Sequence, residues 1–131
     1  MTLDIAILRL AGSLASYSSL RQGVIAQNIA NADTPGYRAR DLLPFAAAFA
    51  DAAFEPAGLR ATRAAHLATA AIPPGFRAET MHAPGTVSPN GNTVGVEDQM
   101  MRAAQTKLQH DLALGVYAKS LAILRAGLGR R

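Results

Sequence analysis

The sequence predicts a mainly all-α protein, in which two long terminal helices form an antiparallel, coiled-coil-like pair around an irregular middle. Apolar residues recur every three or four positions near both ends of the chain, which is the spacing of an amphipathic helix. Five of the seven prolines instead fall within residues 55–92. The length of 131 residues suits one domain. We therefore expect a single domain, 1–131, made of a helical segment 1–37, an irregular segment 38–93 and a helical segment 94–131.

The first helix is expected to run from about Asp4 to Ala32. Gly12 and Gly23 each lower its intrinsic stability by up to about 1 kcal/mol relative to alanine. The helix therefore needs packing partners to be stable. Its apolar stripe, with a second row beside it, comprises Ile7, Leu10, Leu14, Tyr17, Val24, Ile25 and Ile29.

The last helix is expected to span about Glu97 to Ala126. Gly95 is an acceptable residue for its N-cap, and Gly127 is suited to a left-handed C-cap. The two terminal helices have similar lengths and lie at opposite ends of the chain, which favours antiparallel pairing. The apolar stripe of this helix consists of Met101, Leu108, Leu112, Val116 and Ile123.

The middle of the chain gives weaker signals. Phe45 and Phe49 are four residues apart and follow Pro44, a pattern that predicts a short helix with this proline at its first position. Thr69–Ile72 and Phe76–Met81 are candidates for short paired strands, although neither alternates cleanly. A long connection of this kind is typical of either a binding loop or a disordered segment.

A distinctive segment follows the first helix. Pro35 restricts Thr34 to extended conformations and so ends the helix nearby. Gly36 supplies the positive φ that a Pro-Gly turn needs at its third position. Asn28 and Asn31 share a helical face, and their amides could bond a neighbouring backbone. We expect these amides to serve a helix end that docks against another chain.

This segment resembles the signature of bacterial flagellar axial proteins, the rod, hook and hook-associated subunits. The matching residues are Asn28, Asn31, Thr34, Pro35, Gly36 and Tyr37. The continuation Arg38–Leu42 and the later Gly91–Val94 resemble the proximal rod proteins of the FlgB family. The similarity covers both ends of the chain and its overall length, and it thins out between Leu43 and Pro89.

The resemblance implies a structural subunit of the proximal rod, which would assemble through its terminal helices into the drive shaft. It also implies partners: copies of itself, other flagellar rod proteins, the inner-membrane ring with its adaptor protein, and the flagellar export apparatus. The expected location is the periplasmic rod of the basal body, reached by type III export without a cleavable signal peptide. Consistent with this, the first nine residues lack the basic leader and long apolar run of a signal peptide.

The composition argues against several other classes of protein. The net charge is +4, but the arginines are scattered and no aromatic residues are interleaved with a basic block, so we expect no nucleic-acid binding. No stretch is long and apolar enough to span a membrane. The absence of cysteine excludes disulfides and thiolate ligands.

The sequence also carries no sign of catalytic or cofactor chemistry. His66, His82 and His110 are far apart, and none has the spacing of a metal-ligand pair. No nucleophile elbow or phosphate-binding loop is present. We therefore expect no enzyme activity, no metal and no cofactor. The alternative to a rod subunit is a small cytosolic helical adaptor or export chaperone, which would form a stable, cooperatively melting helical dimer.

Overall fold

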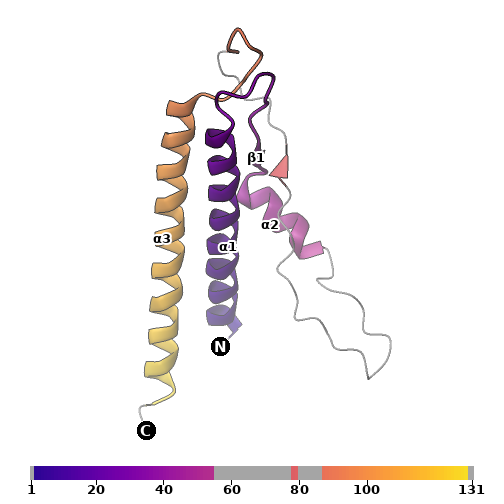
Figure 1. Cartoon of the computed structure of the whole chain (residues 1–131). Helices are drawn as coiled ribbons and strands as arrows, with labels where there is room; N and C mark the ends of the chain where they lie inside the picture. Colours follow the sequence, from indigo (N-terminus) through magenta and orange to yellow (C-terminus); the bar gives the residue numbers. More distant parts are fainter. Residues whose placement is uncertain (1, 55–77, 80–86, 130–131) are drawn as a thin grey trace, which may run out of the picture.

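The computed structural model describes residues 2–54, 78–79 and 87–129. Its main feature is a pair of long antiparallel helices, α1 (Thr2–Ala30) and α3 (Val96–Gly127), which lie side by side (Figure 1). Both chain termini lie at one end of this pair, and the segments that follow α1 and precede α3 meet at the other. The predicted all-α class with paired terminal helices is confirmed.

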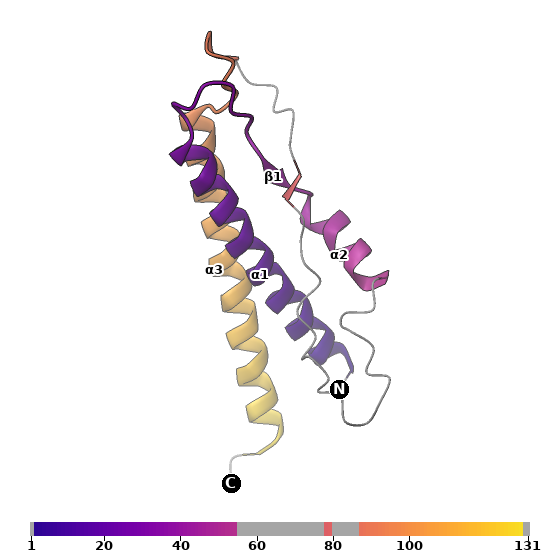
Figure 2. The same cartoon turned by 45° about the vertical axis from the view of Figure 1, so that its right-hand side comes forward.

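A smaller layer covers the side of α1 that faces away from α3. After the turn, the strand β1 (Asp41–Leu42) runs back along α1 and leads into the helix α2 (Phe45–Phe54). β1 pairs antiparallel with β2 (Ala78–Glu79). Figure 1 shows that α2 projects away from α1, and Figure 2 shows that α1 and α3 diverge toward the chain termini. Helix α1 therefore lies between two partners and needs apolar residues on two faces.

The buried set is small and almost half polar. Among residues with described side chains, the buried apolar ones are Ala11, Tyr17, Ile25, Ala39, Leu42, Val94 and Ala113. The buried polar ones are Ser18, Asn28, Asp41, Asn92, Gln99 and Thr106. Burying a polar group costs free energy unless it is hydrogen-bonded, so the partners of these side chains decide whether the structure is stable.

Two details at the helix ends differ from the prediction. Helix α1 ends at Ala30, two residues before the expected Ala32, and the carbonyls of the two residues after it are bonded by a side chain described below. The prediction of a left-handed C-cap at Gly127 is wrong. Gly127 is the last residue of α3, and the positive φ occurs at Gly129, at +74°. The backbone N–H of Leu128 already donates to the Leu124 carbonyl, so the helix continues to Gly127 without a left-handed residue there. Gly95 is the N-cap of α3, as expected.

The middle segment contains the expected short helix, α2, which begins one residue later than predicted. Pro44 precedes it, and the Pro44 carbonyl accepts the backbone N–H of Ala48, the first bond of that helix. Ala78–Glu79 forms the only part of the candidate strand Phe76–Met81 that is described as strand. The other candidate, Thr69–Ile72, lies outside the described residues, as do His66 and His82.

Candidate functional site

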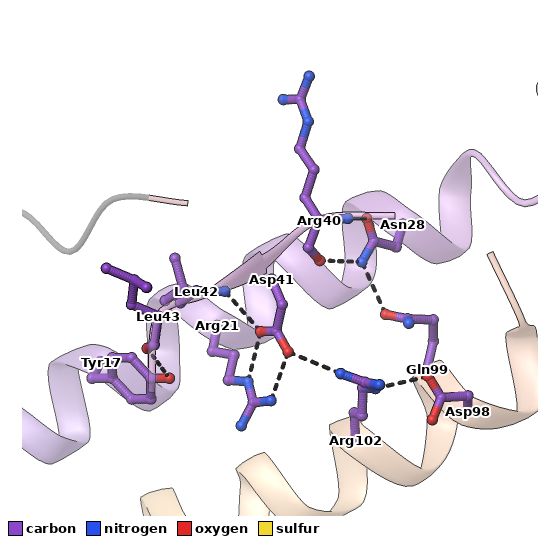
Figure 3. A network of polar contacts seen from close by, with 10 residues as sticks. All are labelled: Tyr17, Arg21, Asn28, Arg40, Asp41, Leu42, Leu43, Asp98, Gln99 and Arg102. Atoms are coloured by element: carbon purple, nitrogen blue, oxygen red, sulfur yellow. Dashed lines mark hydrogen bonds and ion pairs between the residues drawn. The ribbon is translucent and has the colours of Figure 1, made fainter. Parts of the chain in front are cut away.

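The turn end of the helix pair contains a network of buried polar side chains centred on Asn28 (Figure 3). The Asn28 Nδ2 donates to the Arg40 carbonyl at 2.6 Å and to the Gln99 Oε1 at 2.9 Å. Its Oδ1 accepts the Arg40 backbone N–H at 3.0 Å and the Tyr37 hydroxyl at 3.3 Å. One side chain therefore joins α1, the segment leading to β1, and α3.

The chemistry of these partners requires an amide at position 28. The Arg40 backbone N–H can only donate and the Arg40 carbonyl can only accept, which also fixes which end of the Asn28 amide is nitrogen. A carboxylate would lack the donor and an apolar side chain would lack both groups. Substitution at Asn28 therefore leaves buried backbone groups of Arg40 without partners, which costs more than the bond itself contributes.

A second buried amide, Asn92, caps the end of α1 from a distant part of the sequence. Its Nδ2 lies 2.9, 2.7 and 2.8 Å from the carbonyls of Asn31, Ala32 and Thr34. Its Oδ1 accepts the Val94 backbone N–H at 2.7 Å. These carbonyls belong to the turn that follows Ala30, the last residue of α1, so a side chain from just before α3 holds this turn in place.

Backbone contacts complete this junction. The Gly36 N–H donates to the Asn90 carbonyl at 2.9 Å, and the Thr93 N–H donates to the Tyr37 carbonyl at 3.0 Å. Gly36 and Gly91 have φ of +69° and +80°, which favours glycine. A Cβ placed at Gly91 would lie 3.6 Å from the Gly36 Cα, an ordinary contact, so conformation and not space selects glycine there.

We call this set of residues the clasp. It consists of Asn28, Tyr37 and Arg40 from the N-terminal side, and Asn92, Thr93 and Gln99 from the C-terminal side. Ala39 joins it through its N–H, which donates to the Thr93 Oγ1 at 2.9 Å. The hydrogen bonds that link its N-terminal side to its C-terminal side join residues that are 54 to 71 positions apart in the sequence. The clasp thus connects the end of the first long helix and its turn to the start of the last helix.

Below the clasp, the buried carboxylate of Asp41 joins the same three elements by ion pairs. Arg21 on α1 binds it in a bidentate manner, with Nε and Nη2 at 2.8 and 2.7 Å from the two carboxylate oxygens. Arg102 on α3 donates to it at 3.1 Å and also to Asp98 at 2.7 Å (Figure 3). A bidentate guanidinium–carboxylate pair fixes orientation as well as distance, so Asp41 holds β1 against both helices.

The environment of Asp41 leaves this group ionised. Burial by itself would raise its pKa, because it disfavours the charged form. The hydrogen bonds from Arg21, the Leu42 N–H and Arg102 outweigh that effect, and the pKa of Asp41 lies below its ordinary value. In the folded chain at neutral pH the cluster therefore carries a negative charge between two guanidinium groups.

Tyr17 anchors the start of α2 to α1. Its hydroxyl donates to the Leu43 carbonyl at 2.7 Å, and its ring packs edge-on against Phe45 with centroids 5.4 Å apart. Burial raises the pKa of Tyr17. A groove of about 560 Å³ opens beside this contact, and Leu112 of α3 also lines it. The apolar surface of α3 therefore continues into a hollow at α2.

The other residues of the predicted signature have local roles. Asn31 donates to the Gln27 carbonyl of its own helix and accepts the Thr34 hydroxyl. Pro35 and Gly36 occupy the centre of a turn in which the Tyr37 N–H donates to the Thr34 carbonyl, so the Pro-Gly turn is confirmed. The expected docking of the amide pair against another chain takes a different form, because Asn28 is used within the chain and Asn31 within its helix.

Helix α3 faces α1 with small and polar residues. Its buried positions are Gln99, Thr106 and Ala113, spaced by seven, as along a helix seam. Met101 follows Gln99 by two positions, and Leu108 follows Thr106 by two positions. Two positions correspond to about 200° around the helix. These two residues of the predicted stripe therefore lie on the outer face, whereas Leu112 and Val116 lie about 100° and about 60° around the helix from Ala113. All five residues of the predicted stripe are exposed: Met101, Leu108, Leu112, Val116 and Ile123.

The predicted residues of α1 divide between the interior and the surface. Tyr17 and Ile25 are buried, and Leu14 and Val24 are partly exposed. The exposed ones are Ile7, Leu10 and Ile29. Together with the stripe of α3 they leave both long helices with apolar side chains that this chain does not cover.

The sequence prediction missed four functional side chains of the junction: Asp41, Asn92, Gln99 and Arg102. Asn92 had a usable signal, because it sits in a Gly-Asn-Thr run directly before a predicted helix. Gln99 belongs to the seven-residue repeat of small and polar residues in α3. The ion pairs that join Asp41 to Arg21 and to Arg102 span 20 and 61 positions, and local patterns contain no signal for them.

Across residues 2–54, 78–79 and 87–129, no group of three or more His, Asp or Glu side chains is arranged to hold a metal ion. Within the same ranges, no helix combines the length and apolar character needed to cross a bilayer.

Comparison with known proteins agrees with this architecture. The family model described as flagella basal body rod protein matches residues 8–38, which cover most of α1 and the turn after it. The flagellar basal body rod protein FlgB of Agrobacterium fabrum is 34% identical over 110 residues, which is 82% of this chain and 81% of the relative. FlgB of Escherichia coli is 33% identical, with 83% of each chain covered. FlgB of Salmonella typhimurium is 31% identical, with 88% of each chain covered. Identity of about one third over more than four fifths of both partners shows that this chain belongs to the FlgB family of flagellar basal body rod proteins.

Proposed function

We propose that this chain is a non-enzymatic structural subunit of the flagellar basal-body rod. It assembles with copies of itself and with other rod proteins through the outer faces of its terminal helices. The family to which the chain belongs supports the structural role. The observation that carries the assembly mode is the apolar stripe of α3, whose side chains are exposed.

The exposure of this stripe supports packing between subunits. The side chains of Met101, Leu108 and Leu112 are 62, 71 and 63% exposed, and Ile123 is 63% exposed. An apolar row that continues along a helix is a typical surface for a protein partner. Burial of such side chains contributes about 25 cal/mol per Å² of apolar area. A partner helix would therefore supply free energy that the small, partly polar interior of one chain does not.

The same proposal includes the route of export, the location and the neighbours of the subunit. The subunit would be delivered by the flagellar export apparatus without a cleavable signal peptide and would act in the periplasmic rod. Its neighbours would include the inner-membrane ring and its adaptor protein. A helical adaptor or export chaperone would instead be a stable dimer at low concentration, and sedimentation of the purified chain separates the two cases.

The test is a pair of charges placed in the stripe. The double substitution Leu108→Asp with Leu112→Asp should abolish incorporation into basal bodies and motility, because burying two carboxylates in an apolar contact is costly. The matched control is Lys107→Asp with Ala118→Asp, at positions that are also exposed on α3, and it carries a similar loss of helix propensity. Removal of the residues from Gly127 onward should be milder. If the stripe variant assembled as well as the control, the proposed surface would be wrong.

A further inference from the structure

The clasp has a property that its role as a cap does not require. Each of its two buried amides bonds residues from the opposite end of the sequence, and each uses both its donor and its acceptor. Asn92 bonds the carbonyls of the turn after α1, those of Asn31, Ala32 and Thr34, while Asn28 holds Arg40 and Gln99. Buried polar groups that lack partners destabilise a structure. Each side of the clasp is therefore stable only in the presence of the other.

We propose that the clasp is a latch that couples the signature turn to the start of α3, so that neither end of the chain reaches its packed form until the other has arrived. Asn28 and Asn92 act in it as positioning residues. They fix the register of α1 against α3 and thereby the alignment of the outer apolar faces.

The geometry distinguishes a latch from two independent helix caps. An independent cap would take its donors and acceptors from its own neighbourhood, as Asn31 does with Gln27 and Thr34. Instead, the Asn92 amide reaches back 58 to 61 positions, and Asn28 reaches forward 71 positions to Gln99. The two glycines of positive φ, Gly36 and Gly91, lie against each other at the same junction.

A consequence rests on the proposed function. In a chain delivered with its N-terminus first, α1 and the turn after it would stay open until residues 90–99 followed. The outer faces of the two helices would then come into register only in a complete chain. A latch of this kind would disfavour assembly of incomplete subunits.

The absence of cysteine allows a direct test in the purified full-length chain. Ala39 and Val94 are 3 and 9% exposed and lie on opposite sides of the clasp. Single variants Ala39→Cys and Val94→Cys report opening by their rate of reaction with a thiol reagent, since a buried thiol reacts only when its surroundings open. Ala30→Cys, at an exposed position, gives the rate without protection.

A latch predicts reciprocal effects. Asn92→Leu should raise the labelling rate of the Ala39→Cys probe, and Asn28→Leu should raise that of the Val94→Cys probe. Each rise should be about tenfold or more, which corresponds to about 1.4 kcal/mol of opening free energy. Asn31→Ala, the control from the same signature, should change either rate by less than about twofold. Thr93→Val, which removes only the acceptor for the Ala39 N–H, is a milder variant should the leucine substitutions unfold the chain.

Three results would overturn the latch. Reaction of both probes at the Ala30→Cys rate, in the otherwise unchanged chain, would mean that the clasp is not closed. An effect of each leucine substitution on the probe of its own side alone would mean independent caps. An equal effect of the Asn31→Ala control would indicate general fraying of α1. None of these measurements involves rod assembly, so failure of the latch and failure of the proposed function are distinguishable.

Discussion

The two ends of the α1–α3 pair are built on different principles. At the turn end, directional hydrogen bonds from Asn28 and Asn92 bind backbone groups of Arg40 and of the turn after α1. Toward the chain termini, apolar side chains such as Ile7 and Ile123 are exposed, and the helices diverge (Figure 2). Hydrogen bonds depend steeply on geometry, whereas apolar contacts are non-directional. The turn end thus sets the relative position of the helices, and the other end offers surface to partners.

The largest effect on monomer stability is expected at Asn28. The substitution Asn28→Leu should lower the free energy of unfolding by about 3 kcal/mol or more, because it leaves the buried N–H and carbonyl of Arg40 and the amide of Gln99 without a partner. Asn31→Ala should cost less than about 1 kcal/mol, since Asn31 bonds only its own helix and turn. Urea unfolding followed by circular dichroism measures both values. If the two substitutions lowered the free energy of unfolding by similar amounts, Asn28 in the clasp would contribute no more than a residue that bonds only its own helix end.

The next largest effect is expected at Asp41. Asp41→Ala should lower the free energy of unfolding by about 3 kcal/mol, because it leaves the partly buried guanidinium of Arg21 beside no carboxylate and leaves Arg102 with Asp98 alone. Asp98→Ala is the control, as its ion pair with Arg102 is more exposed, and it should cost less than about 1 kcal/mol. The same unfolding experiment compares the two. Equal costs would show that burial of the carboxylate adds nothing.

The pH dependence of stability is a second test of the contribution of the ionised Asp41 carboxylate. The folded-state pKa of Asp41 lies below its ordinary value, because the hydrogen bonds to the charged form outweigh its desolvation. Its stabilising contribution is therefore fully present above the unfolded-state pKa of about 3.9 and is lost as the pH falls through the folded-state value. Unfolding free energies measured from pH 6 down to roughly pH 2 should decline less steeply in Asp41→Asn than in the unchanged chain. Parallel curves would contradict this assignment.

The smallest effect is expected at the two buried hydroxyls that have no hydrogen-bond partner among the described residues, those of Ser18 and Thr106. Ser18→Ala and Thr106→Val should be neutral or should stabilise the chain by up to about 1 kcal/mol, because they remove an unsatisfied polar atom and keep the shape of the site. Thr93→Val, whose hydroxyl accepts the Ala39 N–H, should instead destabilise it. A loss at Thr106 as large as that at Thr93 would mean that its hydroxyl has a partner.

Part of the fold could be predicted from the sequence, as particular residues show. The periodicity of Tyr17, Ile25 and their neighbours predicted α1 to within two residues at each end, because a long amphipathic pattern leaves few alternatives. The turn at Pro35 and Gly36 was predicted for the local reason that proline and glycine restrict the backbone. The end of α3 lies within one residue of the prediction, but the left-handed cap at Gly127 is wrong, because glycine permits such a cap without requiring one there.

The candidate site was only partly accessible from sequence. Asn28 was identified as a residue that bonds a backbone, but its partners Arg40 and Gln99 were not. A hydrogen bond between residues 71 positions apart depends on how two helices are placed, and no local pattern encodes that placement. The ion pairs of Asp41 were missed for the same reason.

The sequence by itself determined the two long helices, the turn that ends the first, and the apolar rows that run along them, because these follow from backbone restriction and periodicity within a few residues. Only the tertiary structure decided which face of each helix is covered. It placed Gln99, Thr106 and Ala113 of α3 inside and left the more apolar row outside. The physical reason is that the buried amides of the clasp accept only one arrangement of donors and acceptors, and this arrangement fixes the face of α3 that meets α1.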